Sequence, residues 1–285
     1  MTASAPLNPP PDSRHVILDG ALIPAASARI SALGDGFLFG LGLFETIKVL
    51  AGHPVFHREH FARLGAGAAA LGLPLPASPA ELLAHCRQCI EANRLADGAL
   101  KVVVFQDDGR VGELIVPRTT RYGAEVYARG FRLHTVPTHR AGPLAALKSL
   151  NYLECLRAKQ AAQALGCDEA LLTDPAGTVL EGSTSNVFMV RDGLVHTPPL
   201  GLGILPGIVR AQVRQLLPRD QVRESAISRA QLLAAEEVFV TNSLLGVMPV
   251  ARLDDHEFSL SSNPVTRSVR AAFQAREQQA CAGQA

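Results

Sequence analysis

Lysine is scarce in this chain, which has four lysines against 23 arginines, and Lys148 opens the run K-S-L-N-Y-L at residues 148 to 153. An amine that must release its proton to react cannot be replaced by a guanidinium, which stays charged at any working pH. Lys148 is therefore a candidate nucleophile and base. The alternative is an ordinary ammonium whose aliphatic stem covers apolar surface beside Leu147 and Leu150.

A carboxylate in a loop of small residues is the second candidate. Glu181 begins E-G-S-T-S-N-V-F, after a short predicted strand and before an apolar one. Glycine and hydroxyl residues allow the backbone and side chains of such a loop to approach a ligand closely. The simpler interpretation is a polar turn between two strands.

A third candidate is the helix start in G-L-G-I-L-P-G-I-V-R, residues 201 to 210. Free backbone N–H groups at such a start suit an anion, particularly a phosphate. Arg63, on an earlier predicted helix, could add a guanidinium to the same anion. Taken singly, these are an ordinary helix start and a surface arginine.

Two further patterns favour no function. Cys86 and Cys89 have the spacing of a metal or redox motif, but they lie inside a predicted helix without a second ligand pair. His57 and His60 are three residues apart on a predicted helix, and the sequence offers them no acidic partner.

Composition predicts a globular protein. With 285 residues, 47% of them hydrophobic and 19% charged, the chain can form a sizeable core in two domains or one large one. A net charge of +1 gives no basic surface for nucleic acid or an anionic membrane, and no apolar run approaches the roughly 18 residues of a membrane span. Five cysteines without a signal-like start favour a cytoplasmic protein with free thiols. The expected partners are small molecules or copies of the chain.

The elements that must position these residues follow from periodicity and turn signals. Residues 15 to 56 predict a meander of strands, followed by a helix over 57 to 72 and another from Ser78, where S-P-A-E supplies an N-cap, a first-turn proline and a capping glutamate. A hairpin around D-D-G-R and a strand at 131 to 136 come next.

Residues 137 to 147 contain proline and glycine without a clear period, which predicts an interdomain linker. The expected segments are a mobile arm (1–14), a small N-terminal α/β domain (15–136), this linker (137–147) and a larger C-terminal domain (148–285). The second half alternates strands with helices near 150 to 165, from about 206 and from about 264.

Taken in order, K-S-L-N-Y-L, E-G-S-T-S-N-V-F and G-I-L-P-G-I resemble the class IV aminotransferase family, the fold-type IV enzymes that use pyridoxal phosphate. The resemblance runs from G-F-L-F-G-L-G-L-F-E-T-I to V-M-P-V near residue 250. It implies a two-domain fold of the α/β class, α+β type, with the cofactor in the interdomain cleft. It also implies a homodimer.

The resemblance assigns roles to the three candidates. Lys148 would hold pyridoxal phosphate as a Schiff base, the internal aldimine, and shuttle a proton, while Glu181 would bind the pyridine nitrogen. The remaining implied cofactor contacts are Arg63 with the amides of Ile208 and Val209 at the phosphate, Ser243 at the phosphate, and Tyr152 near the ring oxygen. A carboxylate at the ring nitrogen favours its protonated form, which lets the ring accept the electrons of a breaking Cα–H bond.

The chain departs from the family pattern where substrates are recognised. G-D-G-F at 34 to 37 and G-L-G at 40 to 42 lack a usual acid and arginine, and Val209 replaces a common threonine. After Phe105 only Q-D-D-G-R replaces a longer basic loop that helps receive a substrate carboxylate. The remaining candidates for substrate contacts are Phe44, Arg110, Arg118, Arg121 and Leu244, although each arginine could equally be a surface residue.

Three activities stay open at this point. The first is an aminotransferase that moves an amino group between an amino acid or amine and a 2-oxo acid. The second is an aminodeoxychorismate lyase releasing pyruvate and 4-aminobenzoate, which V-T-N-S-L-L-G-V-M-P-V at 240 to 250 favours. The third, a pyridoxal-phosphate-binding protein without turnover, is disfavoured by the presence of Lys148, Glu181 and Arg63 together.

Overall fold

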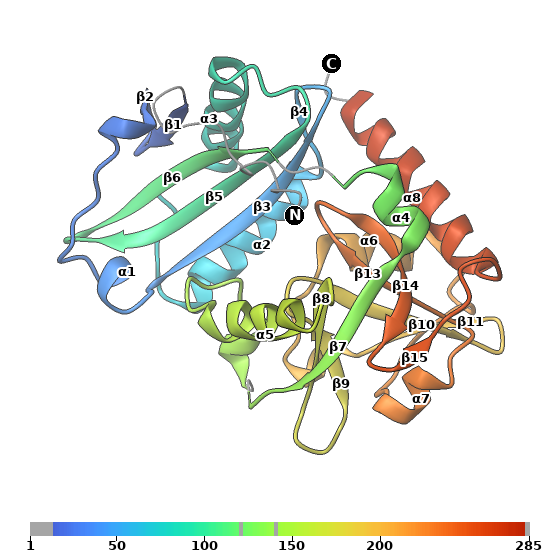
Figure 1. The fold of residues 1–285 in the computed structure, drawn as a ribbon. Coiled ribbons are helices and arrows are strands. Elements are labelled where there is room, and N and C mark those ends of the chain that lie inside the picture. The colour runs from blue at the N-terminus through green and yellow to red at the C-terminus, as the bar shows by residue number, and fades with distance from the viewer. Residues whose placement is uncertain (1–13, 120–121, 140–141, 283–285) are drawn as a thin grey trace. The chain divides into compact units, whose positions relative to one another are not determined.

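A computed structural model describes residues 14–119, 122–139 and 142–282, which form two compact units, each with its own sheet (Figure 1). Unit 1 comprises Met1–Arg121, Lys148–Asn151 and Glu277–Ala285, and unit 2 comprises Tyr122–Leu147 and Tyr152–Arg276. All of the arm expected over residues 1 to 14, except Arg14, lies outside the described residues.

Unit 1 contains a six-stranded sheet of order β2-β1-β6-β5-β3-β4. Its strands are β1 (His15–Leu18), β2 (Ala21–Pro24), β3 (Gly42–Leu50), β4 (His53–Pro54), β5 (Gly98–Asp107) and β6 (Arg110–Arg118). The meander expected over 15 to 56 is wrong in topology, because β1 pairs with β6, with Ile17 opposite Ile115, and the β5–β6 hairpin separates it from β3. Turn residues identify a hairpin but do not specify which hairpins become neighbours.

Two helices of unit 1 pack on one face of this sheet. They are α2 (His57–Ala70) against β3 and α3 (Pro79–Ala92) against β1 and β6, and the short α1 (Asp35–Leu38) precedes β3. The expected capping box of α3 is confirmed, since Ser78 Oγ accepts from the Glu81 amide and the Glu81 carboxylate accepts from the Ser78 amide at 2.8 Å. Cys86 and Cys89 are core residues of α3, each 0% exposed.

Unit 2 contains a mixed sheet of order β12-β11-β10-β13-β14-β7-β8-β9, with β15 paired to β14. Its strands are β7 (Phe131–Pro137), β8 (Glu169–Thr173), β9 (Val179–Gly182), β10 (Asn186–Arg191), β11 (Leu194–Thr197), β12 (Val222–Glu224), β13 (Glu237–Asn242), β14 (Gly246–Leu253) and β15 (His256–Glu257). Its core includes Phe188 and Phe239, whose stacked rings lie 4.8 Å apart.

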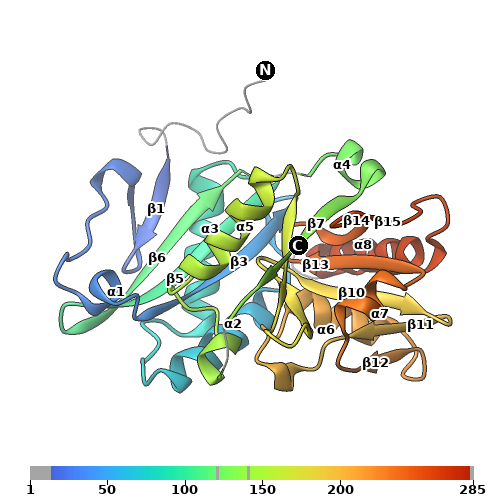
Figure 2. The ribbon, with the colours of Figure 1, turned by 60° about the horizontal axis from the view of Figure 1, so that its bottom comes forward.

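The helices of unit 2 include those expected in the second half. They are α4 (Ala124–Arg129), α5 (Leu153–Ala164), α6 (Ile208–Leu216), α7 (Arg229–Leu233) and α8 (Pro264–Ala282), of which α8 ends within unit 1 from Glu277 onward. Short 3₁₀ turns occupy Ala25–Ser27, Pro143–Ala146 and Leu200–Leu202. The start of α8 lies beside β13 (Figures 1 and 2), where Glu237 accepts from the amides of Val265 and Thr266 at 3.0 and 2.7 Å.

The observed units differ from the expected domains in two places. Strand β7 was expected in the N-terminal domain, but it pairs in parallel with β8 and β14 and therefore belongs to unit 2. Lys148–Asn151 were expected in the C-terminal domain, but they belong to unit 1, where Ser149 bridges to Leu43 and the Phe44 amide donates to the Lys148 carbonyl at 2.8 Å.

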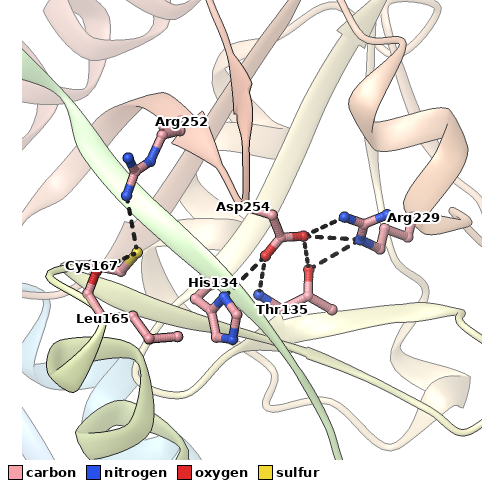
Figure 3. Close-up of polar contacts among 7 residues, drawn as sticks. All are labelled: His134, Thr135, Leu165, Cys167, Arg229, Arg252 and Asp254. Carbon is pink, nitrogen blue, oxygen red and sulfur yellow. Dashed lines mark hydrogen bonds and ion pairs between the residues drawn. The ribbon is translucent and has the colours of Figure 1, made fainter.

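Asp254, in the turn between β14 and β15, joins three elements of unit 2 (Figure 3). Its carboxylate accepts from the amide and hydroxyl of Thr135 on β7, both at 2.8 Å, and from Arg229 on α7 at 2.6 and 2.9 Å. His134 Nδ1 lies 3.2 Å away. Across the described residues, no helix has the length and apolar content needed to cross a bilayer.

Candidate active site

The amine of Lys148 lies over an aromatic ring of unit 1. Its Nζ is 4.7 Å from the centroid of Phe44 on β3, and Lys101 Nζ on β5 is 4.2 Å from the same centroid. Phe44 is 7% exposed. Two of the four lysines in the chain therefore share one aromatic neighbour, an arrangement that the negative face of the ring favours.

Lys101 was not among the residues expected to act. It lies opposite Thr46 on β3 and Val116 on β6, so it faces away from the core that Leu100 and Val102 enter from the same strand. Burial, and then the charge of Arg118, lower the pKa of Lys101. Its signal in the sequence was a rare lysine at a polar position of an otherwise apolar strand.

The candidate substrate arginines occupy different surroundings. Arg118 ends β6 opposite Ala99, on the face of the sheet that carries Lys101. Arg110 begins β6, and its guanidinium pairs with Asp19 at 2.7 Å and Asp107 at 2.9 Å. Arg121 lies outside the described residues. The charge of Arg118 thus reaches Lys101, whereas Arg110 is held by two carboxylates.

Arg63, on α2, forms a bidentate ion pair with a buried carboxylate. Its Nε and Nη2 donate to the two oxygens of Glu45 at 2.8 and 2.6 Å, and His60 Nδ1 lies 2.7 Å from the second oxygen. The expectation that His60 has no acidic partner was therefore wrong. Glu45 comes from β3, 15 residues earlier, and helical spacing cannot reveal such a partner.

Burial alone would raise the pKa of Glu45, but the charge and hydrogen bonds of Arg63, with the contribution of His60, lower it to about 2. Burial lowers the pKa of His60 and outweighs its contact with Glu45. Arg63 is therefore the main positive partner of an ionised Glu45, and the pair fixes the plane of the guanidinium.

In unit 2, Glu181 is the last residue but one of β9, and 6% of its surface is exposed. Its Oε2 accepts from Asn186 Nδ2 at 3.2 Å and from the Leu205 amide at 3.1 Å, and the same Asn186 Nδ2 donates to the Leu205 carbonyl at 3.0 Å. Hydrogen bonds thus join the Glu181 loop to the turn that precedes α6.

The helix α6 begins as the sequence predicted, with Ile208 and Val209 at its first two positions. Gly207 is the N-cap, and no side chain caps the helix. A Cβ atom at Gly207 would lie 1.9 Å from Asn186 Oδ1, so only glycine allows this close approach. The first amides of a helix have no acceptor within it, which leaves them suited to an anion.

Two turns carry the remaining candidates of unit 2. The hydroxyl of Tyr152, the N-cap of α5, donates to the Ser183 carbonyl at 2.6 Å. Asn242 shapes the turn that contains Ser243 and Leu244: its Nδ2 donates to the Thr184 carbonyl at 3.1 Å and its Oδ1 accepts from the amides of Leu244 and Leu245, both at 2.9 Å.

Two buried hydroxyls lie in these same segments. Ser185 Oγ and Thr241 Oγ1 have no hydrogen-bond partner among the described residues, and Thr241 on β13 is opposite Asn186 on β10. Buried polar groups are normally bonded, so unpartnered ones mark a place where another molecule or water can bind. This is the neighbourhood of Glu181 and the 242–245 turn.

These features define the class of protein: a mixed α/β fold that carries an amine, a buried carboxylate and an uncapped helix start. The chain belongs to the class IV aminotransferase family, whose sequence model, described as amino-transferase class IV, matches residues 42–253.

Particular relatives include a putative branched-chain-amino-acid aminotransferase of Methanocaldococcus jannaschii, 31% identical over 84% of this chain and 88% of that one. A D-alanine aminotransferase of Bacillus licheniformis is 31% identical over 91% and 95%. The Escherichia coli branched-chain amino acid aminotransferase superposes with a TM-score of 0.86 at 28% identity, covering 93% of this chain and 95% of that one.

Two further solved structures bear on activity and cofactor. A putative 4-amino-4-deoxychorismate lyase of Legionella pneumophila has a TM-score of 0.81 at 29% identity, covering 88% of this chain and 96% of that one. A further branched-chain amino acid aminotransferase, solved with pyridoxamine 5'-phosphate, has a TM-score of 0.84 at 26% identity and 95% coverage of both chains.

Proposed function

We propose that this protein is a pyridoxal-phosphate-dependent aminotransferase that moves an amino group between an amino acid or amine and a 2-oxo acid. The observation that carries the proposal is the family match over residues 42–253, which includes Lys148, Glu181 and Arg63. Relatives named as aminotransferases support the same reaction class.

The donor and acceptor groups fit the cofactor. Glu181 Oε2 already accepts two hydrogen bonds, which orient the carboxylate that would face a pyridine N–H⁺. The start of α6 offers amides of Ile208 and Val209 to a phosphate, with Ser243 as a further phosphate contact, and Arg63 adds a guanidinium whose plane Glu45 fixes. Tyr152 would contact the ring oxygen.

Bound pyridoxal phosphate supplies a ring that accepts the electron pair left when a substrate Cα–H bond breaks. Lys148 Nζ is the amine that would hold the cofactor covalently and, once released, carry the proton from and to substrate carbon.

Lys101 and Arg118 are the groups that we propose for the substrate carboxylate, in place of the shortened loop. They lie on one face of the β5–β6 hairpin, where Lys101 is over the Phe44 ring and feels the charge of Arg118. Lys101→Met should raise KM for L-glutamate and L-leucine, which both carry a carboxylate beside the amino group, about 10-fold or more, since a hydrogen bond to a charged group contributes about 1.5–3 kcal/mol. The change should be smaller for (R)-1-phenylethylamine, which has no carboxylate. Lys101→Arg should retain most of the affinity.

Arg110→Ala is the matched comparison, because it removes a cation from the same hairpin that is already paired with Asp19 and Asp107. Its KM values should stay close to those of the unaltered protein. Equal effects of Lys101→Met on the two amino acids and on the amine, or a larger effect of Arg110→Ala, would contradict this assignment.

The reaction itself is tested by mixing the protein loaded with pyridoxal phosphate with D-alanine, L-glutamate, L-leucine or (R)-1-phenylethylamine. At least one donor should convert the cofactor absorbance to that of the pyridoxamine form, and a 2-oxo acid should reverse the change. A failure of every donor, with pyruvate released from aminodeoxychorismate, would replace the aminotransferase by a lyase.

That lyase is the second candidate, and the structural similarity to the Legionella protein favours it. The turn at residues 242 to 245, which Asn242 shapes with three hydrogen bonds, lies within the sequence run that first pointed to the lyase. Release of 4-aminobenzoate without a 2-oxo acid requirement distinguishes the two reactions.

We also propose that the protein acts as a homodimer. Leu33, Phe37 and Phe39 in unit 1 are 74%, 65% and 70% exposed, and an apolar segment this exposed is typical of an interaction surface. Light scattering of the purified protein should give twice the chain mass. A monomer at micromolar concentration that turns over substrate would contradict this proposal.

A further inference from the structure

A buried carboxylate of unit 2 has no role in the reaction proposed above. Glu169 begins β8 and is 0% exposed. Its Oε1 accepts from Ser183 Oγ and from its neighbour's amide, Ala170 N, at 3.0 Å. Its Oε2 accepts from Thr184 Oγ1, and Lys159 Nζ lies 3.5 Å away. The two oxygens thus hold the hydroxyls of two consecutive loop residues.

The loop that Glu169 holds is compact. The Ser183 amide donates to the Ala170 carbonyl at 3.0 Å, and the Gly182 amide donates to the Ser185 carbonyl at 2.6 Å. A Cβ atom at Gly182 would lie 2.2 Å from Ser185 Oγ and 3.3 Å from Glu169 Cγ. Residues 182 to 185 therefore form a tight loop, and the Glu169 carboxylate binds its two hydroxyls.

The carbonyls of the same two loop residues contact candidate site residues. Ser183 O accepts from the hydroxyl of Tyr152, and Thr184 O accepts from Asn242 Nδ2. Asn242 in turn fixes the amides of Leu244 and Leu245. Each hydroxyl held by Glu169 thus belongs to a residue whose carbonyl orients a second segment of the site.

We propose that Glu169 is the positioning residue of this site, which sets the 182–185 loop and through it both Tyr152 and the 242–245 turn. A carboxylate with 0% exposure and several donors cannot reach a substrate, so its effect must pass through the residues it holds. The inference rests on the proposed function, because it assigns these segments to the binding of pyridoxal phosphate.

The test compares Glu169→Ala with the double variant Ser183→Ala/Thr184→Val, which removes the two hydroxyls and leaves the carboxylate in place. In the protein without cofactor, both variants should show faster hydrogen exchange at residues 183–185 and 244–245 while unfolding cooperatively. Both should also raise the Kd for pyridoxal phosphate at least about 10-fold, the factor that a loss of about 1.4 kcal/mol gives.

The pH midpoint of the bound-cofactor absorbance separates positioning from a general loss of stability. It should shift in both variants, since Tyr152 would no longer be held at the ring oxygen, whereas a merely structural residue would lower the melting temperature alone. Glu236→Gln is the control: this exposed carboxylate of unit 2 accepts from the Asp192 amide at 2.8 Å and should leave Kd and midpoint unchanged.

Suppose that the unaltered protein binds pyridoxal phosphate, and that the folded Glu169 and Ser183/Thr184 variants have the same Kd and the same pH midpoint. That result would overturn the inference about Glu169 and leave the proposed function standing. Failure of the unaltered protein to bind pyridoxal phosphate would instead overturn the proposed function together with this inference. If Glu169→Ala does not fold, the double variant decides by the same criteria.

Discussion

The two lysines beside Phe44 should respond differently to replacement by arginine. Lys148 and Lys101 both lie close to the Phe44 centroid, at 4.7 and 4.2 Å. Lys148 is proposed to react, which requires a neutral amine, whereas Lys101 is proposed to bind a carboxylate, which requires only a cation. Arginine can therefore substitute for Lys101 but not for Lys148.

Lys148→Arg should lower turnover by at least about 10²-fold, the lower end of what a positioned acid–base group contributes. Arginine keeps the positive charge over Phe44 but cannot give up its proton. The measurement is the single-turnover rate with the best amino donor. Lys48→Arg is the matched control, because its ion pair with Glu277 at 2.9 Å tolerates a guanidinium. Similar rates for both variants would exclude Lys148 as the reacting amine.

Sequence reasoning found the residues that carry a local signal. Lys148 was marked by scarcity, Glu181 by its small-residue loop, and α6 by its glycine and proline. It missed Glu45, Lys101 and Glu169, because their partners come from other strands or helices: Glu45 reaches Arg63, which is 18 residues later, and Glu169 reaches Ser183, which is 14 residues later. Side chains that act on one another across a sheet leave no motif in a single sequence.

Among the elements, β3 and α2 are joined by a buried charge. Glu45 is 1% exposed, and Arg63 is its bidentate partner. Removing one partner of a buried ion pair leaves the other charge uncompensated, which typically costs about 3–5 kcal/mol. The candidate phosphate ligand is therefore also part of the framework of unit 1.

We expect Arg63→Ala to lose about 3 kcal/mol of unfolding free energy at pH 7 in the absence of cofactor. In the unaltered protein the pKa of Glu45, about 2, lies below its ordinary value of 4.5. Its contribution to stability is thus complete above pH 4.5 and is lost as the pH falls toward 2. Urea unfolding at several pH values should show this acid-dependent loss, and Arg63→Ala should show less of it.

Arg58→Ala, at an exposed position five residues earlier on α2, is the control and should change stability by no more than about 0.5 kcal/mol. A loss in Arg63→Ala no larger than in this control would mean that the ion pair does not stabilise the helix on its strand.

The Asp254 cluster gives an element-scale prediction for unit 2 (Figure 3). Burial would raise the pKa of Asp254, but the Thr135 amide and Arg229 lower it overall. Asp254→Asn should cost about 1–3 kcal/mol, because the amide cannot accept all of these bonds. Urea unfolding measures this, and the stabilising effect of the carboxylate should fade as the pH falls below its ordinary pKa. Arg252→Ala, whose Nη2 is 3.6 Å from Cys167 Sγ, should have a smaller effect.

The elements themselves were more predictable than their order. Helix α3 and the β5–β6 hairpin have local signals, a capping box and a D-D-G turn, and both are confirmed. The place of β7 between β8 and β14 was not predictable, because parallel pairing depends on residues far along the chain. The bridge from Ser149 to Leu43 also joins residues far apart in the chain, so it was not predictable either. Lys148 therefore belongs to unit 1 and not to the C-terminal domain as expected.

For the whole molecule, each unit has a sheet and core of its own, and the proposed cofactor residues come from both units. Lys148 and Arg63 belong to unit 1, whereas Glu181 and Ile208 belong to unit 2. A ligand stabilises every part of a protein whose opening destroys its binding site. Under the proposed function, each unit should therefore gain stability from the cofactor.

Saturation with pyridoxal phosphate should slow hydrogen exchange in both sheets, including β5 of unit 1 and β10 of unit 2. At about 100 times Kd the expected stabilisation is about 2.7 kcal/mol. Exchange measured by mass spectrometry checks this, with pyridoxal, which lacks the phosphate, as the comparison ligand. Protection limited to one unit would show that the other supplies no essential contact.

The five cysteines are all buried, at most 8% exposed. Burial raises the pKa of Cys89 to about 12 and that of Cys86 as well, so neither offers a thiolate at neutral pH. An alkylating reagent should therefore modify the native protein only when a segment opens. Because Cys86 and Cys89 lie in unit 1 and Cys155 and Cys167 in unit 2, the order in which these thiols become labelled records which half of the molecule opens first, without any engineered reporter.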